Sequence, residues 1–198
     1  MKIGLTGSIA CGKSTVSAYL RETGIPVVDA DAISHALSAP GGHALPALRA
    51  AFGDDIFDGE ILNRRALGSV VFADPAQLER LNAIMHPMII AEVSAQLNAL
   101  EKDHPLVAGD VPLLYECGMA HLFDRVWVVS VPRETQIARI MMRDGLSEAE
   151  AIQRIDSQMP VKQKEALADA VIYSDGPIEA TRAQVLSLIR NPHQRRQA

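Results

Sequence analysis

The sequence predicts an α/β protein in which a mostly parallel sheet is flanked by helices. Short runs rich in Val, Ile and Leu alternate along the chain with segments of helical periodicity, an order typical of that class. A glycine-rich segment, residues 7–14, directly follows the first apolar run and opens the first helical segment. The second and third apolar runs are too far apart for a simple crossover, so an added helical layer is expected between them.

Five apolar runs have the composition of short strands that are buried on both faces. They are Lys2–Thr6, Pro26–Ala30, Leu106–Val111, Arg125–Val131 and, more weakly, Ala170–Tyr173. A five-stranded sheet is therefore expected, with the intervening helices packed against it.

Capping residues and prolines indicate where the helices begin and end. The first helix is expected over residues 13–23, with Gly24 as its stop. Asp74 followed by Pro75 predicts the start of a long helix. Because Pro87 lies inside that pattern, a break or kink is expected near His86.

Two further helices are indicated in the last third of the chain. Ser147 and Glu150 have the spacing of a capping box. The final helix is expected from near Pro177 to about Arg190, and the polar tail over residues 191–198 is expected to fray.

Composition excludes several classes of protein. Of the 198 residues, 48% are apolar, which is too many for a disordered chain, and no charge-free apolar run is long enough to cross a membrane. The N-terminal segment is Gly-rich, lacks a positive lead and contains Lys13, so a secretory signal is not expected. The two distant cysteines fit a reducing cytoplasm, and the net charge of -5 offers no general attraction for nucleic acid.

Residues 7–14, Gly-Ser-Ile-Ala-Cys-Gly-Lys-Ser, match the P-loop pattern at every required position. The glycines let backbone N–H groups turn inward, and the N-terminus of the following helix adds partial positive charge. Lys13 is expected to reach the β- and γ-phosphates of a nucleotide, and Ser14 to ligate Mg²⁺. The predicted nucleotide site consists of Ala10, Cys11, Gly12, Lys13, Ser14 and Thr15.

Cys11 lies inside this loop and has two interpretations. It is a small residue where a larger one would not fit, or it is a thiol whose pKa is lowered by the loop amides and Lys13. Resistance of Cys11 to alkylation at neutral pH would exclude the second.

Two charged pairs point to phosphoryl transfer. Asp29 and Asp31 lie at the C-terminal end of the second strand, where an acid can accept the proton of an attacking hydroxyl, although one or both can instead cap the next helix. Arg139 and Arg143 are four residues apart on a predicted helix, a spacing that suits an anion held between them or a solvated face.

Further segments make the chain resemble the dephospho-coenzyme A kinases of the P-loop kinase group. The resemblance extends from Lys2 to about Gly176 and is carried by the P-loop and by several other segments. These are Val-Asp-Ala-Asp at 28–31, Asn-Arg-Arg-Ala-Leu at 63–67, Val-Val-Phe-Ala-Asp-Pro at 70–75, His-Pro at 86–87, Asp-Val-Pro-Leu-Leu-Tyr-Glu at 110–116, Glu-Thr-Gln-Ile-Ala-Arg at 134–139 and Arg-Ile-Asp-Ser-Gln at 154–158.

The resemblance implies a P-loop NTPase fold with three parts. A nucleotide-binding core is expected over residues 1–33, 105–135 and 165–198. A helical domain that binds the acceptor, dephospho-CoA, is expected over 34–104, and a lid over 136–164. The implied reaction transfers the γ-phosphoryl group of ATP, with Mg²⁺, to the ribose 3′-hydroxyl of dephospho-CoA. A cytoplasmic monomer or weak homo-oligomer without a nucleic-acid or membrane partner is expected.

The resemblance also assigns roles to single residues. Asp31 takes the position of the catalytic acid, where it would also contact the acceptor, and Lys13 acts on the phosphates. Arg139 is the lid arginine that contacts the transferred phosphate, with Arg143 as a second lid contact. Residues expected in the acceptor pocket are Arg64, His86 and Glu116.

Two positions depart from the pattern of the resembled family. Ser130 ends the fourth strand where an acid is expected, which leaves Asp110 as a contributor to Mg²⁺ ligation. Ser174 replaces an expected Asn near the adenine, so base contacts there would come from the backbone. Two alternative functions stay open: a kinase for another small molecule or nucleoside monophosphate, and a nucleotide-dependent switch that binds a protein.

Overall fold

The computed structural model describes residues 1–192, which form two compact units. Of the described residues, 1–28 and 97–192 belong to the first unit and 29–96 to the second. Part of the polar tail that was expected to fray, residues 193–198, lies outside the described residues.

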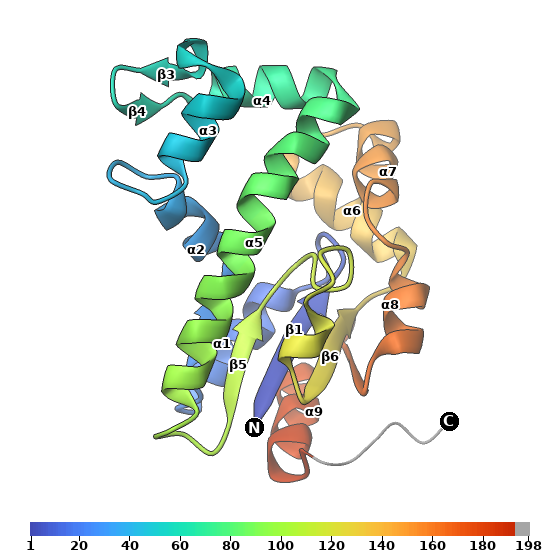
Figure 1. Cartoon of the computed structure of the whole chain (residues 1–198). Helices are drawn as coiled ribbons and strands as arrows, with labels where there is room; N and C mark the ends of the chain where they lie inside the picture. Colours follow the sequence, from blue (N-terminus) through green and yellow to red (C-terminus); the bar gives the residue numbers. More distant parts are fainter. Residues whose placement is uncertain (193–198) are drawn as a thin grey trace. The chain divides into compact units, whose positions relative to one another are not determined.

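A five-stranded sheet forms the centre of the first unit. Its strand order is β2-β5-β1-β6-β7, so β1 has a neighbour from later in the chain on each side. The β1–β5, β1–β6 and β6–β7 pairs are parallel (Figure 1). The strands are β1 (Lys2–Gly7), β2 (Val27–Asp29), β5 (Val107–Asp110), β6 (Arg125–Ser130) and β7 (Ala170–Tyr173), which confirms the five predicted strands to within one residue at each end.

The first unit also contains helical segments, several of which pack against the sheet and bury its apolar side chains. They are α1 (Lys13–Glu22), the 3₁₀ turn η2 (Met119–Leu122), α6 (Arg133–Asp144), α7 (Glu148–Asp156), α8 (Val161–Leu167) and α9 (Ile178–Arg190). The main core joins β1, β6 and β7 to α1 and α9, with Trp127 at 1% exposure among its members. The predicted capping box at Ser147 and Glu150 is present at the start of α7.

The second unit contains the helical layer that was expected, together with a hairpin that was not. Its elements are α2 (Ala30–Leu37), α3 (Leu45–Phe52), the 3₁₀ turn η1 (Asp54–Ile56), β3 (Phe57–Asp58), β4 (Ile61–Leu62), α4 (Arg64–Ala73) and most of α5 (Pro75–Leu100). Strands β3 and β4 are antiparallel and joined by the two-residue loop Gly59–Glu60, whose first residue is a glycine with a φ of 64°.

A break or kink was expected near His86; α5 continues through Pro87, so the break is absent, and a kink there stays a prediction. Proline removes one backbone donor from a helix, and burial of the flanking residues can offset that loss. Met85 is 8% exposed, and Val93 and Leu97 are fully buried. Among residues 1–192, α5 and the shorter helices all lack the length and apolar character needed to cross a membrane.

Candidate active site

The P-loop lies between the end of β1 and the start of α1, as the sequence predicted, and its glycines are sterically required. A Cβ atom on Gly7 would lie 2.5 Å from Sγ of Cys11 and 2.6 Å from the carbonyl oxygen of Val129. Gly12 is the N-cap of α1 and has a φ of 81°, a left-handed conformation that favours glycine. Loop amides followed by the N-terminus of a helix are an arrangement that favours an anion, as expected from the sequence.

Lys13 forms an ion pair with Asp110, the last residue of β5. The register of the sheet causes this contact, since Asp110 is paired with Leu5 on the strand that leads into the loop. The two side chains are 18% and 8% exposed, which makes the pair partly shielded from water. An anionic phosphate at the loop would compete with Asp110 for the Lys13 ammonium group.

The residues around Lys13 fit a magnesium ion that a nucleotide holds mainly through its phosphates. Ser14 is exposed in the first turn of α1, and Asp110 supplies a carboxylate on the neighbouring strand. The described part of the chain contains no cluster of three or more His, Cys, Asp or Glu that could hold a metal by itself. This is the usual situation for Mg²⁺, which keeps several waters and binds through one or two protein ligands.

A cavity of about 450 Å³ opens beside the P-loop. Its lining includes Ser14 and Thr15 of α1, both predicted arginines of α6, and residues that follow β7. The side chain of Arg139 forms part of one wall, and its guanidinium donates hydrogen bonds to the carbonyl oxygens of Ala10 (3.2 Å) and Ser174 (2.7 Å). Arg143 donates two hydrogen bonds to the carboxylate of Asp144 (2.8 and 3.0 Å). The structure therefore places Arg139 and Arg143 at one cavity, and this volume suits a nucleotide-sized ligand.

The hydroxyl of Ser174 is used within the protein. It donates a hydrogen bond to the carbonyl oxygen of Cys11, and Ser174 is 8% exposed. The contact fixes the segment after β7 against the P-loop, so the walls of the cavity are held together on this side. Backbone contacts to a base at this position stay a prediction.

The thiol of Cys11 is buried, and this overturns the hypothesis of a lowered pKa. Burial raises the pKa of Cys11 and outweighs the opposing effects of the loop backbone and the Lys13 charge. Cys11 is 1% exposed and belongs to the main core of the first unit. The interpretation of Cys11 as a small residue where bulk does not fit is therefore favoured.

Both thiols should consequently react slowly with iodoacetamide in the native protein. Burial also raises the pKa of Cys117, and the adjacent Glu116 carboxylate raises it further. At about pH 7 the thiolate fraction of each should lie below that of a free cysteine, and alkylation should speed up as pH rises. Mass spectrometry of native and urea-unfolded protein measures this, and rapid native labelling of Cys11 would contradict it.

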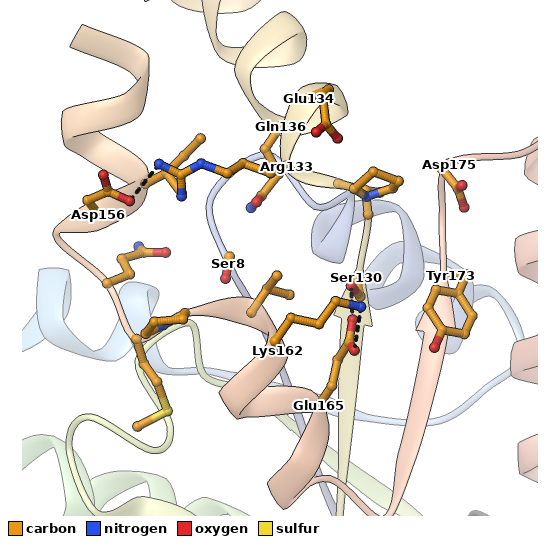
Figure 2. A pocket seen from close by; sticks show the side chains of 17 residues that line it. Ser8, Ser130, Arg133, Glu134, Gln136, Asp156, Lys162, Glu165, Tyr173 and Asp175 are labelled. Atoms are coloured by element: carbon orange, nitrogen blue, oxygen red, sulfur yellow. Dashed lines mark hydrogen bonds and ion pairs between the residues drawn. The ribbon is translucent and has the colours of Figure 1, made fainter. Parts of the chain in front are cut away.

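A second cavity, of about 610 Å³, lies at the ends of β6 and β7 and includes Ser8 of the P-loop (Figure 2). On one side Arg133 pairs with Asp156 at 2.7 Å. On another, the hydroxyl of Ser130 donates to the buried carboxylate of Glu165 at 2.6 Å, and Lys162 also pairs with that carboxylate. The carboxylate of Glu165 on α8 therefore lies beside Ser130, the strand position where an acid was expected.

Lys164 of α8 is fully buried and holds the segment that follows β5. Its ammonium group lies 2.8 Å from the Glu116 carboxylate and donates to the carbonyl oxygen of Pro112 at 3.1 Å. The same carboxylate accepts the backbone N–H of Met159 at 3.1 Å. In the structure Glu116 therefore binds Lys164 and the backbone of Met159. Its contact with the acceptor stays a prediction.

Replacing Lys164 with methionine should lower the free energy of unfolding by about 2 kcal/mol, because the Glu116 carboxylate loses its cation. The side chain of Glu116 is 22% exposed, which limits the loss. Replacing Glu116 with glutamine in the same chain should restore part of the stability. Urea unfolding of the single and double variants measures both effects, and an unchanged midpoint in the single variant would contradict this interpretation.

In the second unit, Asp29 and Asp31 occupy different positions at the start of α2. Asp29 is the N-cap of α2, and its carboxylate accepts the backbone N–H of Ala32 at 3.0 Å. Asp31 is exposed in the first turn of the same helix. Asp29 is therefore the N-cap of α2, and the catalytic role expected for Asp31 stays a prediction.

Arg64 begins α4 because Asn63 caps that helix by accepting the N–H of Ala66 at 3.0 Å. The Arg64 guanidinium donates to Ser38 Oγ (2.8 Å) and to the carbonyl oxygen of His35 (3.2 Å). It borders a cavity of about 200 Å³ whose other walls are mostly apolar. His86 lies on α5 and does not line this cavity in the described residues.

Several residues that shape the site were missed from the sequence. They are Gln136, Gln158, Lys164 and Glu165. Two of them, Gln136 and Gln158, fall inside segments that carried the resemblance, which was the available signal. Lys164 and Glu165 gave no such signal, because charge in a short helix does not by itself indicate burial.

Together, a strand–P-loop–helix unit, a lysine paired to an acid on the next strand and two arginines at the adjoining cavity define a P-loop kinase. The family model described as dephospho-CoA kinase matches residues 1–180. A dephospho-CoA kinase of Symbiobacterium thermophilum is 50% identical over 186 residues, which cover 92% of this chain and 77% of the relative. The chain belongs to the dephospho-CoA kinase family.

Solved structures agree with this assignment. A protein of Thermus thermophilus has a TM-score of 0.82 at 34% identity, with 96% of this chain and 97% of that chain covered. The dephospho-CoA kinase of Campylobacter jejuni has a TM-score of 0.73 at 28% identity, with coverage of 97% and 98%. The predicted P-loop fold is confirmed over nearly the whole chain.

Proposed function

We propose that this chain transfers the γ-phosphoryl group of ATP to the ribose 3′-hydroxyl of dephospho-CoA. The products are CoA and ADP, and the reaction is the final step of coenzyme A synthesis. The observation that carries the proposal is the match of residues 1–180 to the dephospho-CoA kinase family. The geometry supports it, since P-loop residues and the arginines Arg139 and Arg143 line a cavity of about 450 Å³, and Lys13 of the same loop pairs with Asp110.

The P-loop holds the triphosphate of ATP. Backbone amides of residues 10–15 face the phosphates, and Lys13 leaves Asp110 to bind the β- and γ-phosphates. Ser14, with Asp110 nearby, would hold Mg²⁺. The metal ion would neutralise charge on the β- and γ-phosphate oxygens.

Asp31 orients the 3′-hydroxyl of the acceptor and accepts its proton late in the reaction. Transfer is direct and in line, without a covalent enzyme intermediate. Because the transition state of phosphoryl transfer is loose, positioning and charge stabilisation contribute more than the basicity of Asp31.

Helices α6 and α7 act as the lid of the enzyme. In this role Arg139 and Arg143 move onto the transferring phosphoryl group while water is expelled, which limits ATP hydrolysis. Arg139 is well placed for such a change, since its present partners are two backbone carbonyls that a phosphate can replace as acceptor.

Replacing Arg139 with alanine should reduce kcat at least about 100-fold, because the developing charge loses a guanidinium donor. Replacing Arg133, an exposed residue of the same helix that pairs with Asp156, is the matched control. Arg133→Ala should stay within about 3-fold of wild type, as expected when a surface ion pair is removed. Steady-state ADP release measures both, and full activity of Arg139→Ala would remove this residue from the mechanism.

The acceptor binds in the second unit. Arg64 is held by Ser38 and the His35 carbonyl at the edge of an apolar cavity, an arrangement that fits a ligand with both anionic and apolar parts. The exposed Arg65 adds a second positive charge beside it. His86 and Glu116 are further candidates for acceptor contacts.

A coupled assay of ADP release tests the function. Release should depend on dephospho-CoA and should be far slower with AMP, CMP or adenosine, or with no acceptor. Preference for a nucleoside monophosphate would favour the other small-molecule kinases. Slow hydrolysis that only a protein accelerates would favour the switch.

A further inference from the structure

The tip of the P-loop is held by side chains that come from outside the loop. Gln136 Nε2 donates to the carbonyl oxygen of Ile9 at 2.9 Å. Oε1 of Gln158, which follows α7, accepts the N–H of the same residue at 2.9 Å. The carbonyl oxygen of Ala10 accepts a hydrogen bond from Arg139. Both backbone polar groups of Ile9 are therefore paired with glutamine side chains rather than with the loop itself.

Apolar packing joins the same parts of the chain. Ile9 and Ala10 pack against the buried cluster between α6 and α7, which contains Ile140, Ala151 and Ile155. Gln136 is 1% exposed, and Figure 2 shows it at the cavity that Ser8 also lines. A buried amide requires hydrogen-bond partners, so the Ile9 carbonyl and Gln136 satisfy each other.

The backbone of Ala10 needs this support. Its φ of 59° lies in the left-handed region, and among residues 1–192 it is the only residue other than glycine with a positive φ. A Cβ atom makes that conformation unfavourable, so it persists only where contacts with neighbouring groups hold the backbone in it. The two glutamines form hydrogen bonds to the peptide groups on both sides of Ile9, immediately before Ala10, and these hydrogen bonds hold the backbone in that conformation.

We propose that Gln136 and Gln158 are positioning residues of the nucleotide site, which hold Ala10 in the left-handed conformation that directs the P-loop amides toward a phosphate. The proposal rests on the proposed binding of a nucleotide at the loop. Without the glutamines Ala10 relaxes toward ordinary backbone angles, and only a fraction of molecules has a loop that is ready to bind. The apparent Kd for a nucleotide rises by the reciprocal of that fraction.

Two variants test this with ADP as the probe. Gln136→Leu and Gln158→Leu should each raise the Kd for ADP, measured by calorimetry, about 10-fold, and raise the KM for ATP with it. The KM for dephospho-CoA and kcat at saturating ATP should change by less than about 3-fold. Gln153→Leu on the exposed face of α7 is the matched control and should bind ADP like wild type.

Glutamate substitutions separate the roles of the two glutamines. Gln158 acts as an acceptor, so Gln158→Glu keeps its hydrogen bond, whereas Gln136 acts as a donor and Gln136→Glu loses it. Both variants add one negative charge to the same part of the chain. The Kd for ADP should therefore rise more in Gln136→Glu than in Gln158→Glu, and equal or reversed effects would overturn the assignment.

An Ala10→Gly background tests the role of the strained residue. Glycine adopts a φ of 59° without a steric cost, so Gln136→Leu should weaken ADP binding less than about 3-fold in that background. An undiminished effect would overturn the proposal, as would leucine variants that melt at a lower temperature but bind ADP like wild type. Failure of the wild-type protein to bind ADP would instead contradict the nucleotide site itself.

Discussion

Replacing Lys13 with methionine should reduce turnover about 10³-fold, because the transition state loses the cation on its β- and γ-phosphates. Methionine keeps a flexible apolar side chain of similar length, so the packing of the loop should change little. The substitution also leaves the Asp110 carboxylate, 8% exposed, without its ion-pair partner. A lower melting temperature is therefore expected alongside the loss of activity.

Steady-state ADP release with saturating dephospho-CoA measures the loss. Lys102→Met changes an exposed lysine of the same unit and should leave the rate within about 2-fold of wild type. Thermal denaturation of the Lys13 variant shows the fraction folded at the assay temperature. A folded variant with more than one tenth of the wild-type rate would contradict the role given to Lys13.

Asp31→Ala should reduce kcat at least about 100-fold, the effect expected when a general base is removed. The reason is that the acceptor hydroxyl loses the group that orients it and takes its proton. Folding should be preserved, since Asp31 is exposed in the first turn of α2 and the cap of that helix is Asp29.

Asp29→Asn provides the matched control for this prediction. Asparagine caps helices as well as aspartate does, so this variant should keep its fold and most of its turnover. The comparison decides which of two neighbouring carboxylates serves the reaction. A large loss of turnover in Asp29→Asn together with full activity in Asp31→Ala would show that Asp29, and not Asp31, serves the reaction.

The strands and the P-loop could be predicted because their signals are local. Each strand is a short Val- and Ile-rich run, and the conformation of residues 7–14 depends on glycines at fixed spacing. The hairpin of β3 and β4 was missed, since two residues in each strand give too short a pattern to recognise. Pro87 did not end the helix, because packing along the whole of α5, which buries Met85, Val93 and Leu97, also decides whether a helix continues.

Contacts between distant parts of the chain could not be read from the sequence. Gln136 and Gln158 meet at Ile9 only after α6 and α7 have packed together. The burial of Lys164 likewise depends on Glu116, which lies far away in sequence. For Cys11, the sequence showed the nearby positive charge but not the burial that outweighs it.

A crystal structure with a non-hydrolysable ATP analogue, Mg²⁺ and dephospho-CoA tests the central claim most directly. The triphosphate should lie in the P-loop with Lys13 on its β- and γ-phosphates, and the acceptor 3′-oxygen should lie about 2.6–3.2 Å from the carboxylate of Asp31. A nucleotide bound away from residues 7–15, or an acceptor whose 3′-oxygen is out of reach of Asp31, would contradict the account.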